Sequence, residues 1–196
     1  MTRRTILATA TFIASAVLVW WLLFVAVPKW FRGAPEPGPA AAAGTPAAAA
    51  ERKITATLFF IAEDGMSLVP VQREIPFADP VVEQARHVVE AQIAAAPAPL
   101  ASSIPAETKL RAIYLSERGD LFVDLTGEVT SRHTGGALDE LFTVYAVVNS
   151  LTVTLPAIAR VQILVDGKEV DTLAGHVDLR NPLSKNISWV KPDNPS

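Results

Sequence analysis

The sequence predicts an α+β domain, a small antiparallel or mixed sheet with two helices on one face, preceded by a single transmembrane helix. Three observations support this fold class. Residues 6–27 are free of charge. Residues 138–155 carry apolar side chains at helical spacing, and a β-branched run follows at residues 161–165. After residue 50, the order strand–helix–strand occurs twice, which is typical of one layer of helices packed on one sheet.

The first 32 residues resemble a signal anchor. The run Ile6–Val27 has 22 residues, and at about 1.5 Å per residue it spans the roughly 30 Å hydrocarbon core of a membrane. A cleaved signal peptide usually has an apolar core of only about 7–15 residues. Arg3 and Arg4 precede the run, so we expect the N-terminus inside and the rest of the chain outside the cytoplasm.

The composition of residues 33–50 predicts a linker. They contain alanine, proline and glycine and almost no large apolar side chain, so they cannot form a core. As a partly extended spacer at about 3.1 Å per residue, this segment reaches roughly 50 Å. We interpret it as a plain tether between the anchor and a domain at residues 51–184.

The first half of that domain begins with two strands and a helix. Ile54–Ile61 is a strand candidate, and Leu68–Ile75 is extended, with Pro70 limiting it to a sheet edge. Asp79 is the expected N-cap of a helix with Pro80 at its first position. The expected inner face of this helix is Val81, Val82, Ala85, Val88, Val89, Gln92, Ile93 and Ala96.

The second half contains the long central helix. Strands are expected at residues 109–115 and 121–125, followed by a polar loop at residues 127–136. Pro156 ends the helix, which leads into the strand Val161–Val165 and a tight turn at Asp166-Gly167. The expected single apolar face of the helix is Leu138, Leu141, Phe142, Tyr145, Val148, Thr152 and Leu155. Residues 173–183 should pack along the sheet, and residues 185–196 form the expected flexible C-terminal tail.

Composition excludes several kinds of protein. The chain has no cysteine, which rules out disulfides, thiolate metal sites and a cysteine nucleophile. Of its 17 Lys and Arg and 20 Asp and Glu, four basic residues and one acidic residue lie in residues 1–50. Residues 51–196 therefore hold 13 basic and 19 acidic side chains, a net charge of −6. A domain with a net negative charge is a poor partner for the phosphate backbone of a nucleic acid, so we expect no nucleic-acid binding.

Few residues suggest chemistry. Asp124 lies within an apolar strand and Asn149 near the inner face of the central helix, where a polar side chain usually bonds a nearby backbone. His176 and Asp178 could form a catalytic or metal pair, but zinc normally needs three or four ligands. We therefore predict no catalytic, cofactor-binding or metal-binding residues, and no cofactor. The alternatives are a small envelope hydrolase or cell-wall-modifying factor using His176, Asp178 and Asp124, and a soluble receptor with a deep apolar pocket.

Five stretches, taken in order, resemble one known family. They are Leu68-Val69-Pro70-Val71-Gln72-Arg73-Glu74-Ile75, Ser103-Ile104-Pro105 with Thr108-Lys109-Leu110, Val123-Asp124-Leu125, Val148-Asn149-Ser150-Leu151-Thr152, and Val161-Gln162-Ile163-Leu164-Val165-Asp166-Gly167. This domain resembles the GerMN domain, also called the sporulation and spore germination domain, over about residues 54–183. The family often has threonine where Ser150 stands and an aromatic residue where Leu155 stands.

The resemblance implies an extracytoplasmic α/β domain with no known catalytic residues, similar in architecture to ring-building modules of secretion and sporulation assemblies. Together with the anchor, it predicts a single-pass protein of the bacterial cytoplasmic membrane with its C-terminal domain outside the cytoplasm. The expected role is non-enzymatic binding or assembly in the cell envelope, with a link to sporulation or germination as one option. The expected partners are the membrane, through the N-terminal helix, and an envelope protein or cell-wall component; a homo-oligomer is a further option.

Overall fold

The computed structural model describes residue 21 and residues 52–191. The predicted linker and, apart from residue 21, the predicted transmembrane run lie outside these residues. The same holds for residues 192–196 of the predicted tail. Among the described residues, no helix combines the length and the apolar character needed to cross a membrane.

Ten helices and strands are assigned within the described residues. Their order is β1 (Lys53–Ile61), β2 (Leu68–Pro76), α3 (Val81–Ile93), β3 (Leu110–Leu115), β4 (Asp120–Leu125), α4 (Glu128–Ser131), α5 (Ala137–Thr154), β5 (Arg160–Val165), β6 (Lys168–Glu169) and β7 (Leu183–Ser184). The predicted strand–helix–strand order is therefore present twice. The short helix α4 lies within the expected polar loop, where Val129 is buried.

The strands form two sheets instead of the single sheet expected. β1 and β2 make an antiparallel hairpin in register from Lys53 with Pro76 to Ile61 with Leu68. The second sheet has the order β3-β4-β5-β6, with β7 also paired to β5. Because β4 and β5 are parallel and the other pairs antiparallel, this sheet is mixed, as predicted.

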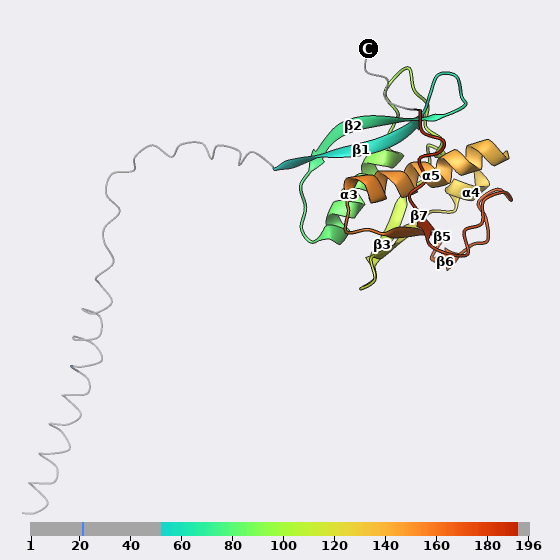
Figure 1. Ribbon diagram of the computed structural model, residues 1–196. Coiled ribbons are helices and arrows are strands. Elements are labelled where there is room, and N and C mark those ends of the chain that lie inside the picture. The colour runs from blue at the N-terminus through green and yellow to red at the C-terminus, as the bar shows by residue number, and fades with distance from the viewer. Residues whose placement is uncertain (1–20, 22–51, 192–196) are drawn as a thin grey trace, which may run out of the picture. The chain divides into compact units, whose positions relative to one another are not determined.

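The helices lie between the two sheets (Figure 1). The hairpin covers one side of α3 and α5, and the β3–β4–β5 sheet covers the other. One continuous apolar cluster joins the layers, from Leu58 in β1 through Val88 and Val148 in the helices to Val123 and Ile163 in the sheet. The prediction of two helices on one face of a sheet was right for the mixed sheet, but it lacked the second β layer.

This arrangement explains the burial of α5. All residues from Phe142 to Leu151 are buried except Tyr145, which is half-buried. A helix that is apolar nearly all round must be covered on several sides. The expected single apolar face was therefore too narrow, because Val144, Ala146 and Val147 also pack in the interior.

Helix α3 lies beside α5 and begins one residue later than predicted. Pro80, and not Asp79, occupies the N-cap position, and the cap makes no side-chain hydrogen bond. Ala85, Val88, Val89 and Gln92 are buried as expected, together with Gln84. Val81 was assigned wrongly to the inner face, since its side chain is 37% exposed.

The second edge of β1 is covered by helix side chains and a loop. The side-chain amide of Gln92 makes two hydrogen bonds with the backbone of Phe59. The Phe59 N–H donates to Gln92 Oε1 at 2.9 Å, and Gln92 Nε2 donates to the Phe59 carbonyl at 2.8 Å. Ser150 of α5 also donates to Gln92 Oε1 at 2.7 Å. Ile61 exchanges backbone hydrogen bonds with Ala101. The hairpin is thereby attached to both helices by hydrogen bonds as well as by apolar contact.

The C-terminal segment crosses from one sheet to the other. After β7, the backbone of Asn186 bonds to Asn149, and the Leu68 N–H donates to the Trp189 carbonyl at 2.8 Å. Lys191 returns an N–H to the Leu68 carbonyl at 2.8 Å. Residues 186–191 of the predicted tail are thus hydrogen-bonded to α5 and to the start of β2.

Candidate functional site

His176 and Asp178 contact different partners. The His176 backbone N–H donates to Glu140 Oε2 at 2.7 Å, and its ring Nδ1 lies 3.2 Å from the same oxygen. Asp178 accepts two hydrogen bonds from the Arg180 side chain, at 2.9 and 2.7 Å. These hydrogen bonds from Arg180 lower the pKa of Asp178 to about 2. The structure does not bring this pair together as the hydrolase alternative requires.

Asp124 holds a turn. Its Oδ1 accepts the Gly167 N–H at 2.7 Å, and its Oδ2 accepts from Arg111 at 2.9 Å. Asp166 and Gly167 have φ angles of 52° and 78°, as a two-residue type I′ hairpin turn requires. The buried carboxylate thus ties the β5–β6 turn to β3 and β4.

Asn149 bonds the backbone of the C-terminal segment. It is fully buried, donates from Nδ2 to the Asn186 carbonyl at 2.8 Å, and accepts the Asn186 N–H on Oδ1 at 3.0 Å. This paired contact matches the interpretation that a polar residue on this helix bonds a neighbouring backbone.

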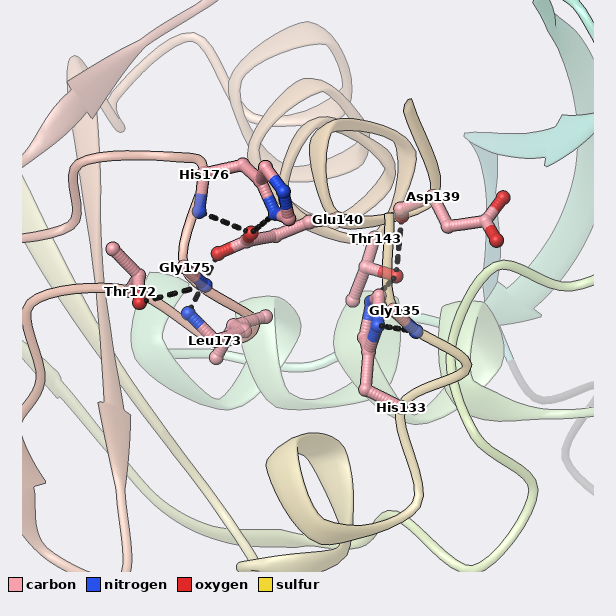
Figure 2. Close-up of polar contacts among 9 residues, drawn as sticks. All are labelled: His133, Gly135, Asp139, Glu140, Thr143, Thr172, Leu173, Gly175 and His176. Carbon is pink, nitrogen blue, oxygen red and sulfur yellow. Dashed lines mark hydrogen bonds and ion pairs between the residues drawn. The ribbon is translucent and has the colours of Figure 1, made fainter. Parts of the chain in front are cut away.

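Glu140 was missed in the sequence and forms the centre of a polar cluster at the start of α5 (Figure 2). Its carboxylate is fully buried and accepts the Leu173 N–H on Oε1 and the His176 N–H on Oε2, both at 2.7 Å. Burial raises the pKa of Glu140, but the backbone N–H groups of residues 173, 174, 176 and 177 lower it more, so the net pKa lies below its ordinary value.

Helical spacing in the sequence could have identified Glu140 as a buried residue. It lies three, four and seven residues before Thr143, Val144 and Val147, all of which are buried. A carboxylate on that face needs several donors, and the polar segment after β6 supplies them. Glu140 thus fixes residues 173–177 against the first turn of α5, where a negative charge is also favoured by the helix dipole.

A second polar group lies on the other side of the same helix end (Figure 2). The Gly135 N–H donates to His133 Nδ1 at 3.0 Å, so the proton of the neutral ring resides on Nε2, 3.1 Å from Thr143 Oγ1. Thr143 donates to the Ser103 carbonyl at 2.7 Å. This chain joins the loop before α5 to the loop that contains Ser103.

The two joined loops form the walls of a cavity with a volume of about 240 Å³. Ile61, at the end of β1, and Asp139, in the first turn of α5, complete its lining with Ser102, Ser103, Ile104, Pro105, Arg132 and Thr134. Gly136, with φ of 91°, permits the sharp entry into α5. A mixed polar and apolar cavity of this size can hold a small molecule, and it is the candidate binding site.

Two further findings concern other kinds of site. Within residue 21 and residues 52–191, no three His, Asp or Glu side chains gather so as to hold a metal ion. A more apolar groove of about 420 Å³ lies between the hairpin and the C-terminal segment, lined in part by Phe59, Val153 and Ile187. It is open at the surface, unlike the deep pocket that the receptor alternative requires.

The fold and these contacts define a class of protein: a mixed α+β domain whose motif residues Asp124 and Asn149 serve its architecture. Residues 57–171 match the family model Germane, described as sporulation and spore germination, which is more than half of the chain. The chain therefore belongs to this family, and the GerMN resemblance is confirmed.

Two solved structures are similar. A Clostridium perfringens protein described as a candidate lipoprotein has 26% sequence identity and a TM-score of 0.50, covering 68% of this chain and 88% of that one. The tandem GerMN domains of the sporulation protein GerM from Bacillus subtilis have 18% identity and a TM-score of 0.53. That match covers 68% of this chain and 46% of the other, so this chain spans about half of its length. Among curated proteins, no match was found.

Proposed function

We propose that this protein is a membrane-anchored, extracytoplasmic domain with a non-catalytic binding or assembly role in the bacterial cell envelope. The observation that carries the proposal is the family match over residues 57–171, which follows an uncharged run and a linker in the same chain. The domain would act by holding a partner near the membrane. Tethering raises the local concentration of a weak binder, so modest affinity would suffice.

The proposed location draws on two observations. The similar Clostridium perfringens protein is described as a candidate lipoprotein, a class attached to membranes by lipid. This chain has no cysteine to carry a thiol-linked lipid, whereas Ile6–Val27 is long enough to span a membrane. In our proposal, the apolar run anchors the protein once in the cytoplasmic membrane and the linker gives the domain its reach.

The proposed link to sporulation or germination rests on the family description and on the similarity to a sporulation protein from Bacillus subtilis. An envelope protein, a cell-wall component or a second copy of the chain would serve as partner. Binding is favoured over catalysis because Asp124, Glu140 and Asn149 are each occupied by backbone groups. Asp178 is paired with Arg180, which leaves its carboxylate committed as well.

The topology is tested with reporters fused after Ser196 of the full chain. We expect a reporter that is active only outside the cytoplasm to be active, because Arg3 and Arg4 flank the inner end of the run. A deletion of residues 6–27 should abolish this activity. If a reporter active only in the cytoplasm works at the same position, the proposed location is wrong.

A further inference from the structure

Strand β3 is the edge strand of the mixed sheet, on the side away from β5 and β6 (Figure 1). The Ser116 N–H donates to the Asp120 carbonyl at 2.9 Å, so these two residues form a hydrogen-bonded pair at the end of the β3–β4 ladder. In an antiparallel ladder, hydrogen-bonded and non-hydrogen-bonded pairs alternate. The backbone groups of Tyr114 therefore face β4, whereas those of Ile113 and Leu115 point to the open edge.

The pairing on the other side of β4 gives the same direction. The Asp166 N–H donates to the Leu125 carbonyl at 2.9 Å, so Leu125 faces β5, and so does Val123 two residues earlier. Val123 is the partner of Ile113 in the register, so Ile113 turns its N–H and carbonyl away from β4. Within residues 52–191, no hydrogen bond reaches the backbone N–H or carbonyl of Ile113 or Leu115 from the open edge.

The side chains along this open edge are apolar. Tyr114 is 57% exposed and Leu115 is 37% exposed. Ile113, between them, is buried in the core, so Tyr114 lies on the face of the sheet away from the helices. The strand has no proline, and its register shift lies near its start, so residues 112–115 form a regular stretch. An exposed apolar edge of this kind is a template for pairing with a further strand.

The open edge of β2, in the hairpin, is protected. Leu68 bonds the C-terminal segment with its N–H and its carbonyl, so every second residue from Leu68 onward faces this edge. Pro70 and Pro76 are two of these residues, and proline has no N–H to donate to an added strand. The Pro76 carbonyl also accepts a hydrogen bond from Gln84 at 3.1 Å. Proline at an edge opposes pairing, so β3 is the better edge for an added strand.

A second copy of β3 fits the open edge of the first. If the two strands run antiparallel with the two Tyr114 residues opposite each other, Ile113 lies opposite Leu115 of the second copy. Each such pair exchanges both N–H···O bonds, and the two-fold axis repeats the pair. The Tyr114 pair then takes the non-hydrogen-bonded position, where cross-strand side chains are closest. Leu115 packs beside the Ile113 side chain of the second copy and loses its exposure.

The charges at the ends of the strand are self-complementary in the same register. Arg111 lies beside Glu117 of the second copy, and the two-fold axis repeats this contact. Both residues are exposed, and the Arg111 side chain is fixed by Asp124 at 2.9 Å. A parallel arrangement in register would place Arg111 beside Arg111 and Glu117 beside Glu117, which is unfavourable. The charges thus favour an antiparallel second copy as the occupant.

We propose that the domain forms a symmetric dimer in which β3 pairs antiparallel with β3 of a second copy, joining the two mixed sheets. This inference rests on the proposed assembly function and names its partner and its surface. The paired stretch is short, so the affinity between isolated domains is modest. Anchoring both copies in one membrane raises their local concentration and favours the dimer.

The absence of native cysteine allows a direct test by disulfide cross-linking. Full-length Tyr114→Cys in membranes is oxidised with copper phenanthroline and analysed on non-reducing gels. Residue 114 lies on the two-fold axis, where the opposed Cα atoms are about 4.5 Å apart and suit a disulfide. Glu117→Cys is the matched control, because this exposed position lies opposite Arg111 and far from its own counterpart. We expect a dimer yield roughly tenfold above that of the control.

A second substitution in the Tyr114→Cys protein tests the backbone pairing. Leu115→Pro removes the N–H that points to the open edge and breaks no hydrogen bond between β3 and β4. The dimer yield should fall to that of Glu117→Cys. Leu115→Lys is the second variant, because a charge opposite the Ile113 side chain opposes edge pairing. Thermal unfolding checks each fold, and Leu115→Lys decides if the proline variant unfolds.

Three results overturn the inference. They are a Tyr114→Cys yield equal to that of Glu117→Cys, an unchanged yield in a stably folded Leu115 variant, and a cross-link to a different protein in place of the dimer. Because the reporter fusions measure location separately, the absence of a cross-linked dimer in a correctly located protein refutes only this inference.

Discussion

Glu140→Ala is expected to destabilise the domain by about 2–6 kcal/mol, taking 1–3 kcal/mol for each buried donor left unpaired. The Leu173 and His176 N–H groups would lose their acceptor in a site where the carboxylate is fully buried. A typical domain has only about 5–15 kcal/mol of stability, so the variant could unfold at physiological temperature. The measurement is urea denaturation of the wild type and the variant.

The matched control is Glu169→Ala, an exposed acidic residue in β6 that should change stability by less than about 0.5 kcal/mol. Glu140→Gln retains one acceptor oxygen, so its loss of stability should lie between those of Glu140→Ala and Glu169→Ala. Equal midpoints for Glu140→Ala and the control would refute the assigned role of Glu140.

The Glu140 carboxylate also predicts that the domain loses stability as the pH falls. Since the pKa of Glu140 is lower in the folded than in the unfolded state, its contribution is full above the unfolded value of about 4.5. It is lost progressively as the pH falls through the lowered folded value. The stability of Glu140→Gln should therefore change less than that of the wild type over this acidic range.

Gln92→Leu is the second substitution with a large expected effect. Leucine has a side chain of similar size but no hydrogen-bonding group, so the Phe59 N–H and carbonyl lose their partners in the interior. With about 1–3 kcal/mol for each unpaired group, we expect a loss of about 2–6 kcal/mol. Ser150 also loses its acceptor, which removes a hydrogen bond between α5 and α3.

Amide hydrogen exchange adds a local measurement for Gln92→Leu. The Phe59 amide should lose more protection than amides in β4, because its hydrogen bond depends on the substituted side chain. Gln72→Leu, at an exposed position of β2, serves as control and should leave exchange at Phe59 unchanged. Uniform loss of protection across all strands, without a larger change at Phe59, would contradict this assignment.

Local patterns in the sequence were sufficient for most elements but not for their assembly. The helical spacing before Pro156 and the Asp166-Gly167 turn identified α5 and the β5–β6 hairpin, because both depend on nearby residues. The division into two sheets depends on which strand edges meet. Gln92 and Ala101 bond the second edge of β1, and no local signal indicates this.

The same difference between local pattern and assembly applies to the site residues. Asn149 was correctly interpreted as a backbone partner, since a buried amide within an apolar helix requires one. Glu140 was missed although its spacing placed it among buried positions, because its donors come from residues 173–177, far along the chain. The cavity at the start of α5 combines β1, two loops and a helix end, so its lining emerges only from the fold.

The central claim is that the domain works by contact and not by catalysis, and complementation of a deletion strain tests it most directly. The strain would express full-length protein carrying His176→Ala and Asp178→Ala together, with protein level and melting temperature checked. The backbone N–H of His176 still reaches Glu140 in this variant, so folding should persist. We predict full complementation. Loss of function at normal level and melting temperature would contradict the claim and favour the hydrolase alternative.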